Sequence, residues 1–333
     1  MKRIRKSVAS RLLGGLCFAA VVGTAMNTAA AQPSLEGKRL AYLTATTSNP
    51  FIAALAKTIQ EQSEKRGMSA TVLTSPYDAA LQSQQVSDAI AQGYDALLIT
   101  PISERAIVPA LTAAKAAKVP VFVVNSPIAD GHDALFESFI GEDHSVLGRL
   151  TGEALAQVLK SRKNPSVALI TGSLAEGVAP RRLEGFKKAI EAHPEIKIVA
   201  TEDAKWDTAA SERIAGQLFA RFAAQGGLDA IYAMADNMAH GTILAAKAAG
   251  VPLGTKDGEL VVVSSNCMKF GIDHIRAGEQ YSTATQMPAR TGTEAVATAA
   301  AFLQGKPVEK HHYLEMAAIT KENLDEFADA CTF

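Results

Sequence analysis

Polar and aromatic side chains follow several apolar, strand-like runs of this sequence at the points where the runs end. Asn49 and Phe51 come shortly after the run at 39–45, and Trp206 comes after the run at 196–201. Flat aromatic faces cover the C–H patches of a polyhydroxylated molecule, and planar polar groups match its hydroxyls. This combination predicts a binding site for such a ligand. The other polar candidates are Asn125, Ser126, Arg182, Asp236, Asn266 and Gln286.

The sequence lacks the motifs that mark catalysis or cofactor binding. It holds no Walker-type loop and no Gly-x-Ser-x-Gly elbow, and the loop from Gly172 to Gly177 has the wrong glycine spacing for a dinucleotide. The seven histidines are scattered, and His311 and His312 lie in a polar stretch that favours solvation over metal binding. We therefore expect a protein that is not an enzyme and that carries no metal or cofactor.

The first 31 residues have the pattern of an export signal. Five basic residues precede an apolar run from Leu12 to about Met26, and small residues stand at Ala29 and Ala31. This pattern is typical of a cleaved secretory signal peptide. We expect cleavage after Ala31 and a mature protein that works in the bacterial periplasm. The alternative is an anchor that stays attached, which the shortness of the apolar run disfavours.

The chain after this leader is mildly acidic. It holds 28 basic and 34 acidic residues, because five of the 33 basic residues lie in the leader, and its formal net charge is −6. A surface of this sign disfavours nucleic acids and anionic membranes as partners. A mature chain of roughly 300 residues is too long for one small core, which predicts two domains.

Two cysteines remain after the leader, Cys267 and Cys331. In an oxidising compartment two thiols favour a disulfide. The sequence alone leaves two interpretations open, a Cys267–Cys331 bridge and two separate buried thiols.

Short apolar runs alternate with amphipathic helical stretches along the mature chain. Runs such as 96–100 and 121–125 are apolar on both faces, as strands of a covered parallel sheet are. The pattern predicts an α/β protein with two doubly wound parallel-sheet lobes, joined by a hinge, and a ligand cleft between them. The predicted strands are 39–45, 70–74, 96–100, 121–125, 167–171, 196–201, 230–233, 260–264 and 281–285. The predicted helices are 50–66, 80–92, 104–118, 180–192, 208–225, 236–249 and 289–304.

The two lobes are expected to share the chain in an interleaved way. After the signal peptide, residues 1–31, the N-terminal lobe takes 38–141 and 287–315, and the C-terminal lobe takes 142–286 and 316–333. No Gly/Ser-rich linker separates them, so short extended crossings are expected, the first near 140–143.

The motif Asn49-Pro50-Phe51 resembles the periplasmic sugar-binding proteins of ABC transporters, of the ribose-binding type (type I periplasmic binding proteins). The resemblance covers roughly 38–313. It implies that Asn49 and Phe51 contact a sugar.

Four later segments carry the same resemblance. They are the stretch around Arg182, the pair formed by Trp206 and the following aspartate, the segment around Asp236, and the Gln-x-Pro that starts at Gln286. The resemblance implies that Arg182 grips hydroxyls with its guanidinium fork and that Trp206 stacks on the ligand opposite Phe51. It implies contacts from Asp236 and Gln286 as well.

Four positions depart from the family pattern. Asn125 and Ser126 stand where the family often has an Asp-Arg pair, Ala235 replaces an asparagine, and Asn266 replaces an aspartate. The expected site therefore carries less charge than a ribose site. A different monosaccharide and a linear sugar alcohol both remain open as ligands.

The resemblance implies a monomeric solute receptor that closes by a hinge and serves the membrane permease of an ABC importer. A sensor for chemotaxis or quorum sensing is the alternative, since both tasks use the closed form. An exported α/β enzyme is a further alternative, which the missing catalytic motifs disfavour.

Overall fold

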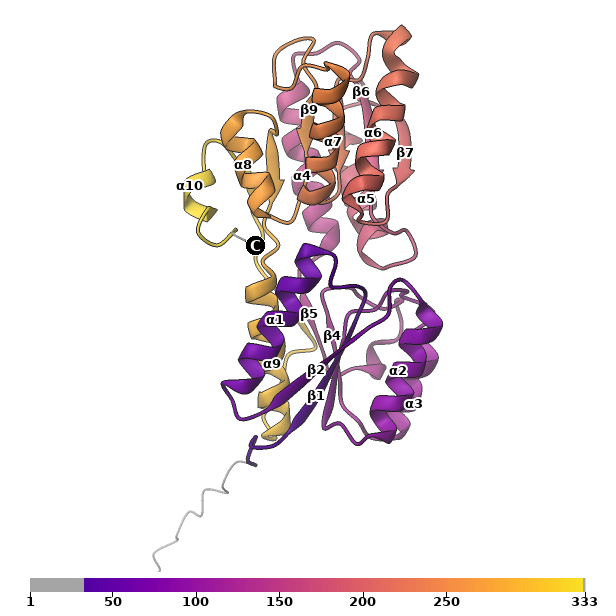
Figure 1. Cartoon of the computed structure of the whole chain (residues 1–333), viewed down its shortest axis with the longest axis vertical. Helices are drawn as coiled ribbons and strands as arrows, with labels where there is room; N and C mark the ends of the chain where they lie inside the picture. The colour runs from indigo at the N-terminus through magenta and orange to yellow at the C-terminus, as the bar shows by residue number, and fades with distance from the viewer. Residues whose placement is uncertain (1–32, 332) are drawn as a thin grey trace, which may run out of the picture. The chain divides into compact units, whose positions relative to one another are not determined.

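The computed structural model describes residues 33–331 and 333, and these form two six-stranded sheets covered by helices (Figure 1). The first sheet has the order β11-β5-β4-β3-β1-β2, and all its strands run parallel. Its strands are β1 (Arg39–Thr44), β2 (Ser69–Thr74), β3 (Ala96–Ile99), β4 (Val121–Val124), β5 (Ser138–Gly141) and β11 (His311–Tyr313).

The second sheet has the order β12-β10-β9-β8-β6-β7. Only its edge strand β12 runs antiparallel, against β10. Its strands are β6 (Ser166–Thr171), β7 (Lys197–Asp203), β8 (Ala230–Ala233), β9 (Val261–Val263), β10 (Ser282–Ala284) and β12 (Ala318–Thr320).

Helices cover both faces of each sheet. On the first sheet α1 packs beside α9, and α2 beside α3 (Figure 1). On the second sheet α4 packs beside α5, and α6 beside α7. The helices are α1 (Pro50–Glu64), α2 (Ala79–Ala91), α3 (Val108–Ala116), α4 (His144–Leu159), α5 (Val178–Ile190), α6 (Thr208–Phe222), α7 (Asp236–Ala249), α8 (Lys269–Ala277), α9 (Pro288–Leu303) and α10 (Leu324–Phe327).

Strand β1 shows why the apolar runs form buried strands. Leu40 and Tyr42 pack into the core under α1 and α9, while Ala41 and Leu43 pack into the core on the opposite face. Side chains alternate between the faces of a strand, so a strand covered on both sides must be apolar throughout. The predicted fold class, two α/β lobes with parallel sheets, is confirmed.

The structure contains elements that the sequence pattern did not predict. They include β5, β11, β12, α8, α10 and the long helix α4. Helix α4 carries Gly148 and Gly152, which lower its intrinsic helix propensity. A Cβ at Gly148 would lie 2.0 Å from the backbone oxygen of Arg182 on α5, so these glycines let the two helices pack closely. Helix α3 was predicted to start at residue 104; it begins at Val108, where Pro109 occupies the first turn.

The chain passes between the two sheets three times. It leaves β5 for α4, returns from β10 to α9, and leaves β11 for β12. The residue boundaries expected for the two lobes remain a prediction. The predicted signal peptide, residues 1–31, lies outside the described residues.

Cys267 and Cys331 form a disulfide, with their Cα atoms 5.1 Å apart. Cys331 thereby ties the end of the chain to the loop between β9 and α8. The ring of Phe333 packs edge-on against Phe51 of α1, with the ring centres 6.0 Å apart. No helix in residues 33–331 combines the length and the apolar character needed to span a bilayer.

Candidate functional site

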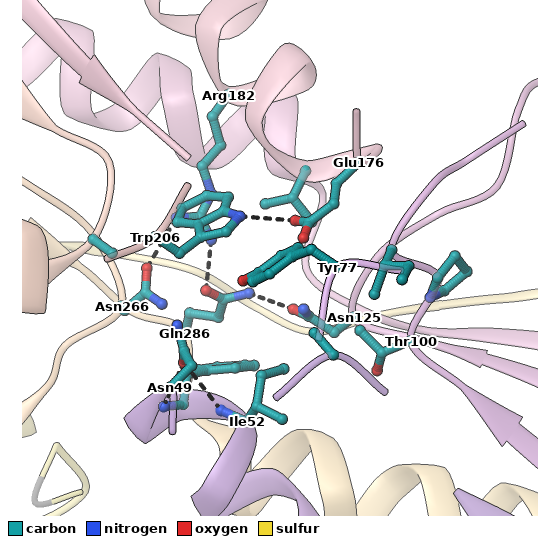
Figure 2. Close-up of a pocket in the computed structure, with 16 residues that line it drawn as sticks. Asn49, Ile52, Tyr77, Thr100, Asn125, Glu176, Arg182, Trp206, Asn266 and Gln286 are labelled. Carbon is teal, nitrogen blue, oxygen red and sulfur yellow. Dashed lines mark hydrogen bonds between the residues drawn. The ribbon is translucent and has the colours of Figure 1, made fainter. Parts of the chain in front are cut away.

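One pocket lies at the carboxyl ends of the strands of both sheets (Figure 2). The empty space among its lining residues is about 470 Å³, including the part open to solvent. Eight of its polar and aromatic lining residues follow a strand end, as residues in ligand sites of parallel sheets do. From the first sheet these are Asn49, Tyr77, Thr100 and Asn125, and from the second they are Glu176, Trp206, Asn266 and Gln286.

The structure brings seven of the nine predicted ligand residues into this lining. Two do not line it, Ser126 and Asp236. The seven that line it are Asn49, Phe51, Asn125, Arg182, Trp206, Asn266 and Gln286. Their contact with a ligand remains a proposal, taken up below.

Asp236 does not line the pocket because its carboxylate is used inside the second sheet. It is fully buried and accepts hydrogen bonds from the Ser264 hydroxyl, from Gln280 Nε2 at 2.9 Å and from Thr283 Oγ1 at 2.9 Å. The backbone N–H of Met268 adds a fourth bond at 2.8 Å. Asp236 therefore fixes the β9–α8 loop, and its position does not support the expected ligand contact. Burial raises its pKa to about 6.

Ser126 is also buried away from the pocket. Only 1% of the residue is exposed, and its hydroxyl has no hydrogen-bond partner among the described residues. The expected ligand contact of Ser126 is therefore not supported by its position. Its neighbour Asn125 turns toward the pocket because its backbone is left-handed, with φ of 63°.

Arg182 is buried at the centre of the site, and its guanidinium is occupied by protein acceptors. Nη1 donates to Met234 O at 2.7 Å and to Asn266 Oδ1 at 2.9 Å. Nη2 donates to Gln286 Oε1 at 2.5 Å, and Nε donates to His144 Nδ1 at 3.4 Å. These bonds let Arg182 organise the polar side chains around it. Arg182 also lines the pocket, and the expected grip of its fork on two ligand hydroxyls remains a prediction.

Gln286 extends this hydrogen-bond network to the first sheet. Its Nε2 donates to Asn125 Oδ1 at 2.6 Å, so Arg182, Gln286 and Asn125 form a continuous chain of hydrogen bonds (Figure 2). Arg182 belongs to α5, Gln286 follows β10, and Asn125 follows β4. One side chain thus bridges the two sheets at a crossing.

His144, at the start of α4, forms hydrogen bonds with both end members of this series, Arg182 and Asn125. Its Nδ1 accepts from Arg182, so Nε2 carries the proton and donates to the backbone oxygen of Asn125 at 2.8 Å. Burial, followed by the charge of Arg182, lowers the pKa of His144 to about 3. The imidazole is therefore neutral at physiological pH, which this arrangement of one donor and one acceptor requires.

Aromatic side chains form the walls. Trp206 donates from Nε1 to Glu176 Oε2 at 2.8 Å and lies directly over Gly172, where an added Cβ would be 2.0 Å from its ring. Phe51 lies in the first turn of α1, which Asn49 caps by accepting from the backbone N–H groups of Phe51 and Ile52. The walls therefore come from both sheets.

Three polar lining residues were not predicted from the sequence, namely Tyr77, Thr100 and Glu176. Tyr77 and Thr100 follow β2 and β3, so the rule that placed Asn49 at a strand end would have found them. Glu176 lies in the loop that was considered only for its glycine spacing. Burial raises the pKa of Glu176 to about 8, and burial together with nearby carboxylates such as Glu176 raises the pKa of Tyr77.

Backbone strain is concentrated in this lining. Tyr77, Asn125, Trp206 and Asn266 all have positive φ, and they are four of the eight described non-glycine residues that do. Such conformations cost about 1–2 kcal/mol each and persist only where the surroundings hold them. The strain therefore marks the pocket as a built site. Within residues 33–331 and 333, no three His, Cys, Asp or Glu side chains come together as metal ligands.

Comparison with known proteins places this chain in one family. A family model for the periplasmic binding protein domain matches residues 40–307. The ribose import binding protein RbsB of Haemophilus influenzae is 28% identical over 309 residues, 93% of this chain and 99% of that protein. A xylitol-binding protein of Mycolicibacterium smegmatis is 25% identical over 251 residues, 74% of this chain and 67% of that protein.

A solved structure supports the same fold. The crystal structure of a galactofuranose binding protein matches with a TM-score of 0.83 at 22% identity, over 88% of this chain and 98% of that chain. The resemblance to the ribose-binding type that the motifs suggested is thus confirmed. This chain belongs to the family of the periplasmic binding protein domain.

Proposed function

We propose that this protein is a periplasmic receptor that binds a monosaccharide or a sugar alcohol and delivers it to the permease of an ABC importer. The observation that carries the proposal is that both sheets place aromatic faces and planar amides in one pocket. Aromatic faces cover the C–H patches of such a ligand, and the amides match its oxygens. The names of the relatives, which include ribose import and xylitol-binding proteins, support this class.

Binding is proposed to close a hinge at the three crossings between the sheets. Asn49 and Phe51 approach the ligand from the first sheet, and Trp206 and Asn266 approach it from the second. A ligand that contacts both walls stabilises the closed form, in which these contacts exist, over the open form. Gln286 lies at a crossing and keeps Arg182 and Asn125 connected in the closed form.

Arg181 adds a second, ligand-independent contact between the halves. Its Nη1 donates to Glu104 at 2.9 Å and its Nη2 donates to Asp130 at 2.9 Å. Arg181 lies on α5 beside the second sheet, and both carboxylates lie in loops of the first. We propose that these ion pairs help hold the closed form while the receptor docks on its permease.

The ligand is proposed to leave chemically unchanged, because the curated relatives are named as binding proteins and not as enzymes. Export after cleavage at Ala31 and a monomeric state complete the proposal. They fit a receptor that must diffuse to its permease and open again.

A thermal-shift screen of the protein purified from the periplasm tests the proposal. The ligands are pentoses, hexoses and C4–C6 sugar alcohols. A ligand at 100 to 1,000 times its Kd should raise stability by about 3–4 kcal/mol, visible as several degrees in Tm. No shift with any member of the panel, or turnover of a bound ligand, would contradict the proposed function.

A further inference from the structure

Arg182 fixes the orientation of the amides around it. An arginine side chain carries only hydrogen-bond donors, so each atom that it contacts must be an acceptor. It therefore faces Oδ1 of Asn266 and Oε1 of Gln286. Gln286 therefore turns its Nε2 donor toward Asn125, and Asn125 must present Oδ1 as the acceptor. None of these amides can flip without placing two donors or two acceptors face to face.

Because the amide oxygens are used inside this network, the amide nitrogens remain available to a ligand in the pocket. Nδ2 of Asn125 and Nδ2 of Asn266 donate to no group in residues 33–331 and 333, although only 7% and 6% of these residues are exposed. Asn49 repeats the arrangement, because its Oδ1 is used to cap α1. All three residues line the pocket, and each nitrogen carries two donors.

The pocket side chains offer fewer free hydrogen-bond acceptors than free donors. Among the lining side chains, only Tyr77, Thr100 and Glu176 carry oxygens outside this amide network. Glu176 Oε2 already accepts from Trp206, and the Thr100 hydroxyl is bonded to that of Tyr42. With a pKa of about 8, the Glu176 carboxyl holds a proton at neutral pH and can itself donate. A ligand made only of hydroxyls therefore brings more protons than the pocket side chains can accept.

We propose that, among sugar-like ligands, this pocket prefers the acid form, whose carboxylate lies against Nδ2 of Asn125 and Nδ2 of Asn266, an assignment that rests on the proposed receptor function. A carboxylate supplies two accepting oxygens and no proton, which matches this donor-rich wall. The permanent charge of Arg182 behind the two amides favours an anion at this place. The hydroxyl groups of the acid then reach Tyr77 and Glu176.

The buried carboxyl groups near Arg182 set the conditions for a test. Burial raises the pKa of Glu142 to about 7, of Asp236 to about 6 and of Glu176 to about 8. Negative charge around the site is therefore lowest at mildly acidic pH. Binding of an anion should be measured near pH 6.

Isothermal titration at pH 6 should compare each acid with its neutral counterparts. The probes are ribonate, xylonate, arabonate, gluconate and galactonate, each beside the alditol and the aldose of the same carbon skeleton. At least one aldonate is expected to bind tenfold or more tightly than both of its neutral counterparts. A neutral compound that binds more tightly than every aldonate overturns the inference and leaves the proposed function standing. If no compound of any class binds, the proposed function and the inference both fail.

Two variants test the place of the carboxylate. Asn125→Asp and Asn266→Asp keep the oxygens that accept from Gln286 and Arg182, but they replace each free donor with a charged acceptor. Each should weaken binding of the aldonate at least ten times more than it weakens binding of the alditol. Asn164→Asp adds the same charge at an exposed site and should change neither. Equal losses for acid and alditol, in variants that melt like the wild type, would show that the carboxylate does not lie at these amides.

Discussion

Arg182 and Asn125 belong to different halves of the protein, yet one side chain connects them. Gln286 accepts from Arg182 Nη2 at 2.5 Å and donates to Asn125 Oδ1 at 2.6 Å. The donor-only guanidinium sets the direction of this chain, and the chain sets which atoms the pocket presents. The same bonds tie the pocket wall of one sheet to that of the other.

Loss of Arg182 should therefore destabilise the protein as well as weaken binding. Arg182→Ala leaves Asn266, Gln286 and His144 with unpaired buried acceptors, which should cost about 2–4 kcal/mol of unfolding free energy. Urea denaturation measures this cost, and the exposed Arg221→Ala is the control. A loss below about 1 kcal/mol would mean that these bonds do not organise the pocket.

Trp206 offers a direct optical signal, because it is the single tryptophan in the chain and lines the pocket. Ligand binding should shift or quench its fluorescence, since a ligand stacked on the indole changes the polarity around it. Trp206→Ala should raise Kd at least tenfold, equal to about 1.4 kcal/mol of lost binding free energy. If calorimetry detects binding of a ligand that leaves the Trp206 fluorescence unchanged, that ligand binds outside the pocket.

Glu176 should make the stability fall with rising pH. Its pKa is about 8 when folded, against an ordinary value of 4.5, so the folded state holds its proton more tightly than the unfolded state. Its contribution to stability is complete below pH 4.5 and is lost as the pH rises through 8. Arg182 opposes this shift by favouring the ionised carboxylate, and Asp203 adds to it. Tyr77, which also faces Glu176, has a raised pKa and stays protonated.

Comparing the wild type with Glu176→Gln isolates this effect. Urea denaturation between pH 6.5 and 8.5 should show a steeper decline for the wild type. His144, whose pKa is lowered to about 3, gives the opposite slope, but only below pH 6.5, where its unfolded form gains a proton. Glu142 titrates within the range but contributes equally to both proteins and cancels in the difference. Parallel curves would show that Glu176 is not buried with its proton.

The ion pairs of Arg181 should act on closure and not on the fold. Both pairs reach solvent, and Asp130 is 98% exposed, so together they should contribute only about 0.5–1 kcal/mol. Arg181→Ala should raise Kd two- to fivefold, mainly through faster ligand release, and added salt should shrink the difference. Arg149→Ala breaks an exposed pair within α4 and should leave ligand release unchanged. Equal release rates for Arg181→Ala and the wild type at low salt would show that the Arg181 ion pairs do not stabilise the closed form.

The alternation of apolar runs and helical stretches was enough to predict most strands of both sheets and the place of the pocket at their carboxyl ends, but not β5, β11 and β12. Strand β1 is apolar throughout because both of its faces are covered, and Asn49-Pro50 marks the start of α1 without ambiguity. Helix α4 was missed because Gly148 and Gly152 serve its packing on α5, a tertiary requirement that contradicts local propensity.

The details of the site depend on contacts that sequence order does not contain. Asp236 carries the family motif, but Gln280 and Thr283 take up its carboxylate. Arg182, whose expected ligand contact remains a prediction, also directs the amides that line the pocket. Such roles emerge only when residues far apart in the chain meet.

The most direct test of the account is a calorimetric titration of the wild type and of Trp206→Ala with the strongest ligand found in the thermal-shift screen. The account predicts one ligand per protein molecule for the wild type and at least tenfold weaker binding for the variant. Equal affinity in both proteins would contradict the claim that this pocket is where a sugar-like ligand binds.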